Sequence, residues 1–184
     1  MKYWTLFLGI LIAGPVFAAC EIDQQQFGVS SQTIEDKLES PKVLEPIPDV
    51  QKQIITVFED ACPKLEEALA LDTSLHYHFI KDQLIAIQLE RAESEDLLLF
   101  EWARQYFGIA EERRIDQEQQ FMQVEEDGRA IQLYIGVLPN AVYQSVLIIS
   151  KEHDDLFEWL AQKEDAIDWE NYEDPEPKSS EEEN

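Results

Sequence analysis

A strongly patterned stretch in the second half of the chain, residues 119–163, constrains the fold more than any other feature. Asp127-Gly128 separates two apolar segments, and this pair favours a type I′ turn because both central residues of that turn need positive φ. Apolar residues then occupy every second position from Ile131 to Val137. Residues 142–149 are almost continuously apolar, as in a strand that is covered on both faces. An amphipathic helix ends the stretch, which therefore predicts two or three strands followed by a helix.

A similar unit lies 57 residues earlier in the chain. Residues 75–90 alternate in the same way around a polar turn at 81–83, and Ser94 is placed to N-cap a helix that ends near residue 106. This helix contains Leu99-Phe100-Glu101-Trp102, which recurs in the second unit as Leu156-Phe157-Glu158-Trp159. Two interpretations remain open: an internal ββα duplication, or chance reuse of the same apolar residues by two amphipathic helices.

Residues 49–69 show the spacing of a further helix, which would begin at Asp49 and be kinked at Pro63. The fold class predicted from these patterns is α+β, with an antiparallel sheet of about five strands packed with helices. The predicted order of elements is α-ββ-α-βββ-α. We assign residues 49–163 to a single α+β domain.

The first 19 residues have the composition of a secretory signal peptide. Lys2 supplies a positive charge, residues 3–12 are apolar but too few to span a bilayer comfortably, and Gly14-Pro15 breaks the run before small residues. We therefore expect an exported bacterial protein, located in the periplasm or on a membrane that faces it.

Two cysteines leave two interpretations of the mature N-terminus. Phe17-Ala18-Ala19-Cys20 resembles the bacterial lipoprotein signal, with Phe17 where that family usually has Leu. The resemblance covers only the first 20 residues and implies lipidation of Cys20, with residues 20–48 as an N-terminal arm or tether. Cleavage after Ala18 would instead leave Cys20 to form a disulfide with Cys62, since exported proteins often pair their cysteines. We favour lipidation slightly.

The formal net charge of −25 restricts the partners of the chain. Nucleic acids and anionic membrane surfaces are excluded as partners by repulsion, and the membrane is reached only through the lipid anchor if it is present. Residues 164–184 hold ten acids and one lysine, a net of −9, and are expected to be a disordered acidic tail. Trp169 and Tyr172 at the start of this tail are candidates for partner binding, with docking onto the domain as the alternative.

No stretch carries a specific catalytic or cofactor motif, so we predict no enzyme, no cofactor and no metal site. His76 and His78 share one face of a strand, with Glu90 on the next strand, but a catalytic zinc site normally needs three protein ligands at defined spacing. Cys62 as a nucleophile would need an electropositive setting, which Asp60 and the general acidity oppose.

These features favour an exported envelope binding protein that neutralises a basic protein partner, of the immunity or inhibitor type. The first alternative is a structural accessory lipoprotein of envelope assembly or secretion, which lipidation at Cys20 would support. The second is an enzyme of unusual type that uses His76 and His78.

Overall fold

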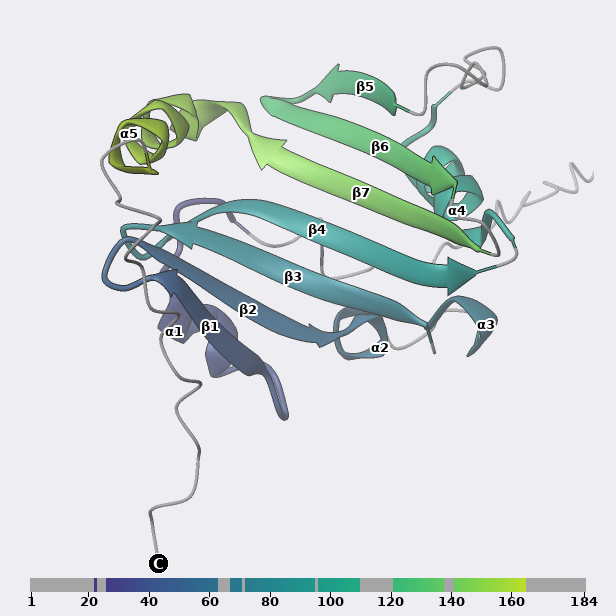
Figure 1. Cartoon of the computed structure of the whole chain (residues 1–184), viewed down its shortest axis with the longest axis horizontal. Helices are drawn as coiled ribbons and strands as arrows, with labels where there is room; N and C mark the ends of the chain where they lie inside the picture. The colour runs from purple at the N-terminus through teal and green to yellow at the C-terminus, as the bar shows by residue number, and fades with distance from the viewer. Residues whose placement is uncertain are drawn as a thin grey trace, which may run out of the picture.

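In a computed structural model, the protein is a seven-stranded antiparallel sheet with helices on both faces (Figure 1). The structure describes residues 22, 26–62, 67–70, 72–94, 96–109, 121–137 and 141–164. The strands are ordered β1-β2-β3-β4-β7-β6-β5, so two meanders meet at the pair β4 and β7. The strands are β1 (Lys42–Ile47), β2 (Gln51–Val57), β3 (Thr73–Ile80), β4 (Gln83–Ser94), β5 (Phe121–Glu126), β6 (Arg129–Val137) and β7 (Val142–Ser150). The helices are α1 (Ser31–Glu35), α2 (Phe58–Ala61), α3 (Glu67–Ala70), α4 (Leu98–Tyr106), the 3-10 turn η2 (Lys151–His153) and α5 (Asp154–Glu164).

Tight turns set the register of two hairpins. Asp127 and Gly128 have φ of 47° and 75° between β5 and β6, as the sequence predicts for a type I′ turn. Lys81 and Asp82 take φ of 49° and 58° between β3 and β4, so this predicted turn is also confirmed. Strand β7 pairs antiparallel with β6 on one side and with β4 on the other over most of its length. This pairing joins the two hairpins into one sheet.

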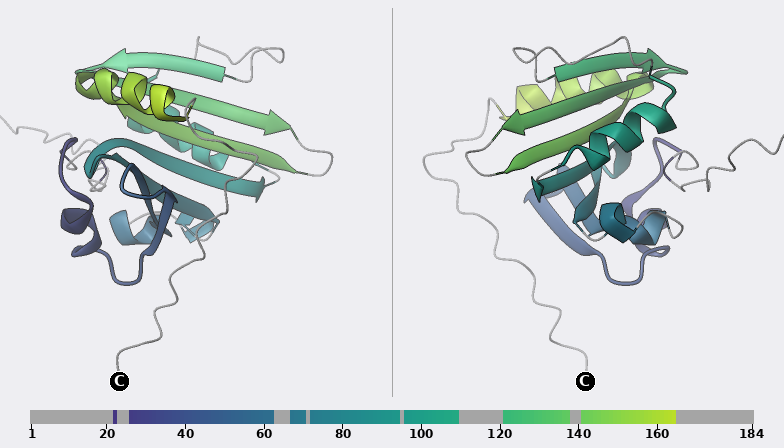
Figure 2. Two further views of the ribbon diagram at one scale, coloured as in Figure 1. Left: turned by 60° about the vertical axis from the view of Figure 1, so that its left-hand side comes forward. Right: turned by 90° about the vertical axis from the view of Figure 1, so that its right-hand side faces the viewer.

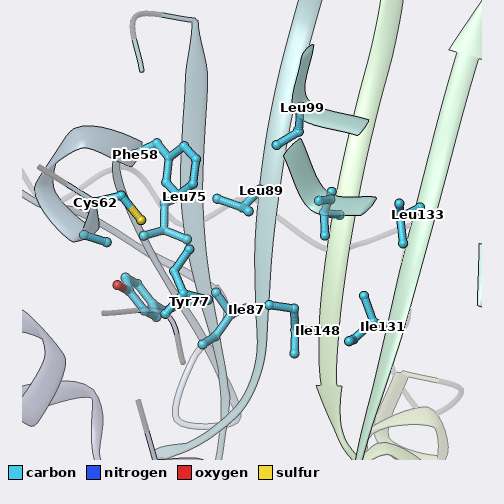
Figure 3. Close-up of a cluster of buried hydrophobic side chains, with 14 of the residues drawn as sticks. Phe58, Cys62, Leu75, Tyr77, Ile87, Leu89, Leu99, Ile131, Leu133 and Ile148 are labelled. Atoms are coloured by element: carbon cyan, nitrogen blue, oxygen red, sulfur yellow. The ribbon is translucent and has the colours of Figure 1, made fainter. Parts of the chain in front are cut away.

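One face of the sheet carries the main hydrophobic core, shown in Figure 3. Alternate residues of the strands point into it and meet Phe58 of α2 and Leu99 of α4, both fully buried. Trp102 of α4 packs edge-on against Phe58 at 5.2 Å and stacks on Tyr106 at 4.7 Å between ring centroids. This aromatic cluster fixes α4 against the sheet.

On the opposite face, α5 covers one end and is the helix of the described residues that packs there. Leu156 and Leu160 of this helix pack on a smaller buried cluster that includes Ile80 and Ile85, and Lys81 Nζ lies 3.5 Å from the centroid of the Trp159 ring. Figure 2 shows α4 and α5 on opposite sides of the sheet. The face that carries α5 is called the open face below.

The predicted α+β class and the order of elements from residue 73 onward are confirmed, but the number of strands is wrong. The sheet has seven strands instead of about five, because residues 42–57 form the hairpin of β1 and β2. The predicted helix over 49–69 is therefore wrong in its first half. Ile54 and Thr56 are buried while Ile55 and Val57 are not, which is the alternation of a strand. β-branched residues favour this conformation over a helix.

Two further expectations differ from the structure. Ser94 does not cap a helix, because it is the last residue of β4, and α4 follows Leu97 without a side-chain cap. The 57-residue duplication is not confirmed, since the two related helices pack on opposite faces of the sheet. At that offset, buried Leu75 corresponds to Gln132, which lies on the open face between the core residues of β6.

Candidate functional site

Six residues of the open face lie in one line across six strands. Val57 pairs with Ser74, Ser74 with Glu90, and Glu90 with Ser145. Ser145 then pairs with Tyr134, and Tyr134 with Phe121. We call this line of side chains the open row: Val57, Ser74, Glu90, Ser145, Tyr134 and Phe121. It runs across the strands away from the end of the face where α5 packs on Ile80 and Ile85.

The two ends of the open row are exposed and apolar or aromatic. Val57 is 57% exposed, Tyr134 43% and Phe121 48%, and these are among the few large apolar side chains of the described chain that reach solvent. Tyr143 extends the aromatic end, with its ring centroid 6.0 Å from that of Tyr134. Gly136 lies beside them, and a Cβ there would come 3.4 Å from the ring of Tyr134 and 3.6 Å from the Cβ of Tyr143. The row therefore offers exposed apolar surface on both sides of a polar centre.

Glu90 is the centre of a hydrogen-bond network on this face. Its Oε1 accepts from the Tyr143 hydroxyl at 2.6 Å and from Gln88 Nε2 at 2.7 Å. Gln88 Nε2 also reaches Ser145 Oγ at 3.2 Å, while its Oε1 accepts from His78 Nε2 at 2.9 Å. Donors from three strands thus point, directly or through Gln88, towards one carboxylate whose side chain is 28% exposed.

His76 and His78 flank this network with their rings stacked at 6.3 Å and nearly parallel. Gln53 Nε2 donates to His76 Nδ1 at 2.9 Å, so the neutral imidazole carries its proton on Nε2. That nitrogen faces Ser74 Oγ at 2.8 Å and Glu90 Oε2 at 3.4 Å. The sequence correctly placed the two histidines on one face beside Glu90.

Burial determines the protonation of these groups. It lowers the pKa of His76 below 6.5 against the opposing attraction of Glu90, and it lowers the pKa of His78 more strongly than the Gln88 hydrogen bond raises it. Burial also raises the pKa of Tyr143 to about 12, assisted by its hydrogen bond to Glu90. At neutral pH the network therefore consists of neutral donors around a single carboxylate.

A pocket opens beside Glu90 at the end of the open row. Its volume is about 310 Å³, near the lower limit of roughly 300–1,000 Å³ typical of ligand sites. The lining residues come from the end of β2, from the start of β3 with the residue before it, and from β4. They are Val57, Asp72, Thr73, Ser74, Glu90 and Ala92.

The other residues singled out by the sequence lie elsewhere. Cys62 is disulfide-bonded and 2% exposed in the main core, beside Phe58 and Leu75 (Figure 3). Cys20, the predicted lipidation or disulfide residue, lies outside the described residues, as do Trp169 and Tyr172. No group of three or more His, Cys, Asp or Glu side chains within the described ranges is arranged to hold a metal ion.

Several residues of this site were missed by sequence reasoning. Tyr134, Tyr143 and Ser145 were recognised only as members of predicted strands, although alternation along 130–136 already placed Tyr134 opposite the core face. Their approach to Glu90 depends on the pairing of β4 with β7, which joins segments about 55 residues apart. Only the order of strands in the sheet brings them together.

None of the helices that the structure describes has the length and apolar character required to cross a membrane. The chain matches no protein-family model, and neither the curated proteins nor the solved structures yielded a significant match. The open row and the Glu90 network are therefore the basis for a functional proposal.

Proposed function

We propose that this protein is an exported envelope binding protein that neutralises a basic protein partner, as an immunity or inhibitor protein does. The observation that carries the proposal is the open row, in which exposed apolar ends flank the Glu90 carboxylate on the open face of the sheet. Aromatic side chains beside an acidic group suit a cationic surface, through cation–π and charge-assisted contacts. The partner therefore binds across β2, β3, β4, β7, β6 and β5.

The charge of the whole chain supports the same partner class. The net charge is −25, and residues 20–163 alone hold 29 acids and 12 bases, a net of −17. A field of this sign steers basic proteins towards the surface and makes association fast and sensitive to salt.

The state of Cys62 supports an exported binding protein over the accessory-lipoprotein alternative. Cys62 is disulfide-bonded, and the sequence contains one other cysteine. A lipid on that cysteine would occupy the sulfur that the disulfide requires. The proposal therefore favours a disulfide at Cys62 over lipidation of Cys20 and locates the protein in the periplasm or on a membrane that faces it.

Affinity capture from an envelope extract tests the proposal, with the mature protein as bait. We expect a basic toxin or hydrolase to be retained at low salt and released at high salt. The purified partner should then lose its activity in proportion to the bound protein. An affinity that does not change with ionic strength, or a retained protein that is itself acidic, would contradict the proposal.

A matched pair of baits locates the contact. Tyr134→Ala removes an exposed aromatic side chain from the open row, whereas Leu97→Ala removes an apolar side chain of similar exposure, 38%, outside it. The first bait should retain less of the partner, and the second should retain as much as the unchanged protein. Equal retention by both variants would place the contact outside the open row.

A further inference from the structure

The pocket beside Glu90 is lined by two acidic residues, Asp72 and Glu90, and no Lys or Arg side chain of the described residues pairs with Glu90. Glu90 Oε1 is occupied by hydrogen bonds from Tyr143 and Gln88. Among the described residues, the basic atom recorded against Oε2 is His76 Nε2 at 3.4 Å, and burial lowers the pKa of that imidazole, so the ring is neutral at neutral pH. Among the residues that the structure describes, no Lys or Arg forms an ion pair with Glu90.

A second carboxylate completes the acidic lining. Asp72 stands immediately before β3 with its side chain 67% exposed, and Glu90 belongs to the neighbouring strand β4. Arg91 reaches Asp72 at 3.7 Å from the buried side of the sheet, so Asp72 is partly neutralised and Glu90 is not. The pocket therefore has an excess of negative charge on its Glu90 wall.

The remaining walls suit the long side chain of an amino acid. Val57 and Ala92 supply exposed apolar surface, and Ser74, whose hydroxyl group contacts His76 Nε2, also lines the pocket. Such a pocket accommodates an apolar stem while its acidic groups hold the charged head.

We infer that this pocket receives an arginine side chain of the basic partner, with its guanidinium group on Glu90 Oε2 and the Asp72 carboxylate. The inference rests on the proposed function and names the anchor by which the partner is held. Arginine fits better than lysine for two reasons. Its planar group binds two acceptors at once, as the carboxylates of Glu90 and Asp72 require, and it is more weakly hydrated than an ammonium group.

Other occupants of the pocket are opposed by charge. A second copy of this chain carries the same net charge of −25, and residues 164–184 carry ten acids against one lysine. Both are repelled from an acidic pocket, so an arginine-bearing basic protein is the occupant that the electrostatics favour.

The inference is tested by titrating the mature protein with short oligo-arginine and oligo-lysine peptides of equal length. Binding is measured by calorimetry at low salt. We expect the arginine peptide to bind more tightly. Glu90→Gln should weaken its binding by roughly tenfold to a hundredfold, because a hydrogen bond to a charged group is lost. Glu59→Gln is the matched control, since Glu59 is exposed on α2 behind the sheet and the change in net charge is the same. That control should change the affinity less than twofold.

A second variant separates shape from charge. Ala92→Leu fills the pocket with an apolar side chain at an exposed position and keeps both carboxylates. It should also weaken arginine binding, and circular dichroism of each variant checks that the fold is retained. Equal weakening by Glu90→Gln and Glu59→Gln would show binding by net charge alone and overturn the inference. Equal binding of the two peptides, or a dimer in sedimentation that Glu90→Gln dissociates, would overturn it as well.

The outcomes for the inference and for the proposed function are separable. If a basic partner is captured and inhibited, but Glu90→Gln and Glu59→Gln bind it equally, the arginine anchor is wrong and the proposed function stands. If the arginine peptide binds as expected but no basic protein is captured, the pocket is assigned correctly and the proposed function is wrong.

Discussion

Gln144 holds the start of α4 from a neighbouring strand, and its replacement by leucine is the sharpest test of the fold. The N-cap position of α4, Leu97, provides no side-chain hydrogen bond. Gln144 of β7 acts instead: its Oε1 accepts from the Phe100 N–H at 3.1 Å, and its Nε2 donates to the Asp96 carbonyl at 2.7 Å. The glutamine is only 1% exposed, so water cannot replace these bonds in a leucine variant.

The expected cost of Gln144→Leu follows from these contacts. Each lost hydrogen bond removes about 0.5–1.5 kcal/mol, and the Phe100 N–H left without a partner in a buried position adds about 1–3 kcal/mol. Leucine fills much of the space of glutamine, so the cavity contribution is small. We therefore expect the free energy of unfolding to fall by roughly 2–6 kcal/mol, a large share of the total of about 5–15 kcal/mol for a typical domain.

Urea unfolding followed by tryptophan fluorescence measures this change, and Gln132→Leu is its control. Gln132 lies on the adjacent strand β6 and bonds only to Gln123 at an exposed position, so its replacement should change stability by less than about 0.5 kcal/mol. If Gln144→Leu costs less than about 1 kcal/mol, or no more than the control, then α4 does not depend on this tertiary cap.

Three further outcomes are expected. Burial lowers the pKa of His76 and His78 below 6.5, so the unfolded chain binds protons that the folded chain does not, and stability falls as the pH decreases through 6.5. The urea midpoint should drop between about pH 7.5 and about pH 5.5 and should stay flat in a variant with both histidines changed to glutamine. Leu99→Ala should cost about 2–5 kcal/mol in the same assay, because Leu99 is fully buried, while Leu97→Ala at 38% exposure should cost less than about 0.5 kcal/mol. The intact mass of the protein should rise on reduction and show no acyl adduct, since Cys62 is disulfide-bonded.

Local patterns sufficed for the parts of the fold that depend on neighbouring residues. The turns at Asp82 and Asp127 and the strands beside them were predicted, because alternation and turn chemistry act within a few residues. The short helix α1 is also set locally, because the Ser30 hydroxyl group at its N-cap accepts from Thr33 N. These features depend on interactions between residues that are close in the sequence.

The errors arose where tertiary contacts decide. Apolar residues between Val50 and Ala61 fit a helical spacing, yet Ile54 pairs with Tyr77 and the segment extends the sheet. Ser94 offered a local cap, but β4 continues to this residue because it pairs with Val142, and the distant Gln144 satisfies the helix start. Where a segment fits both a helix and a strand, local sequence does not decide between them, because the outcome depends on pairing with distant strands.

The candidate site was predictable only in part for the same reason. The histidines and Glu90 lie on consecutive strands, so their shared face followed from alternation. Tyr143 and Ser145 come from β7, and the sequence did not indicate that β7 would pair with β4. The open row is thus a product of strand order.

Glu90 is expected to contribute to arginine binding and to add little to the stability of the fold. A carboxylate that is 28% exposed and surrounded by neutral donors costs desolvation without the gain of an ion pair. In Glu90→Gln the amide oxygen still accepts from Tyr143 and Gln88, so we expect stability to change by less than about 1 kcal/mol while arginine binding weakens by roughly tenfold to a hundredfold. Urea unfolding of this variant beside the peptide titration measures both. A loss of several kcal/mol would mean that the charge serves the fold, and the carboxylate would then need no partner to explain it.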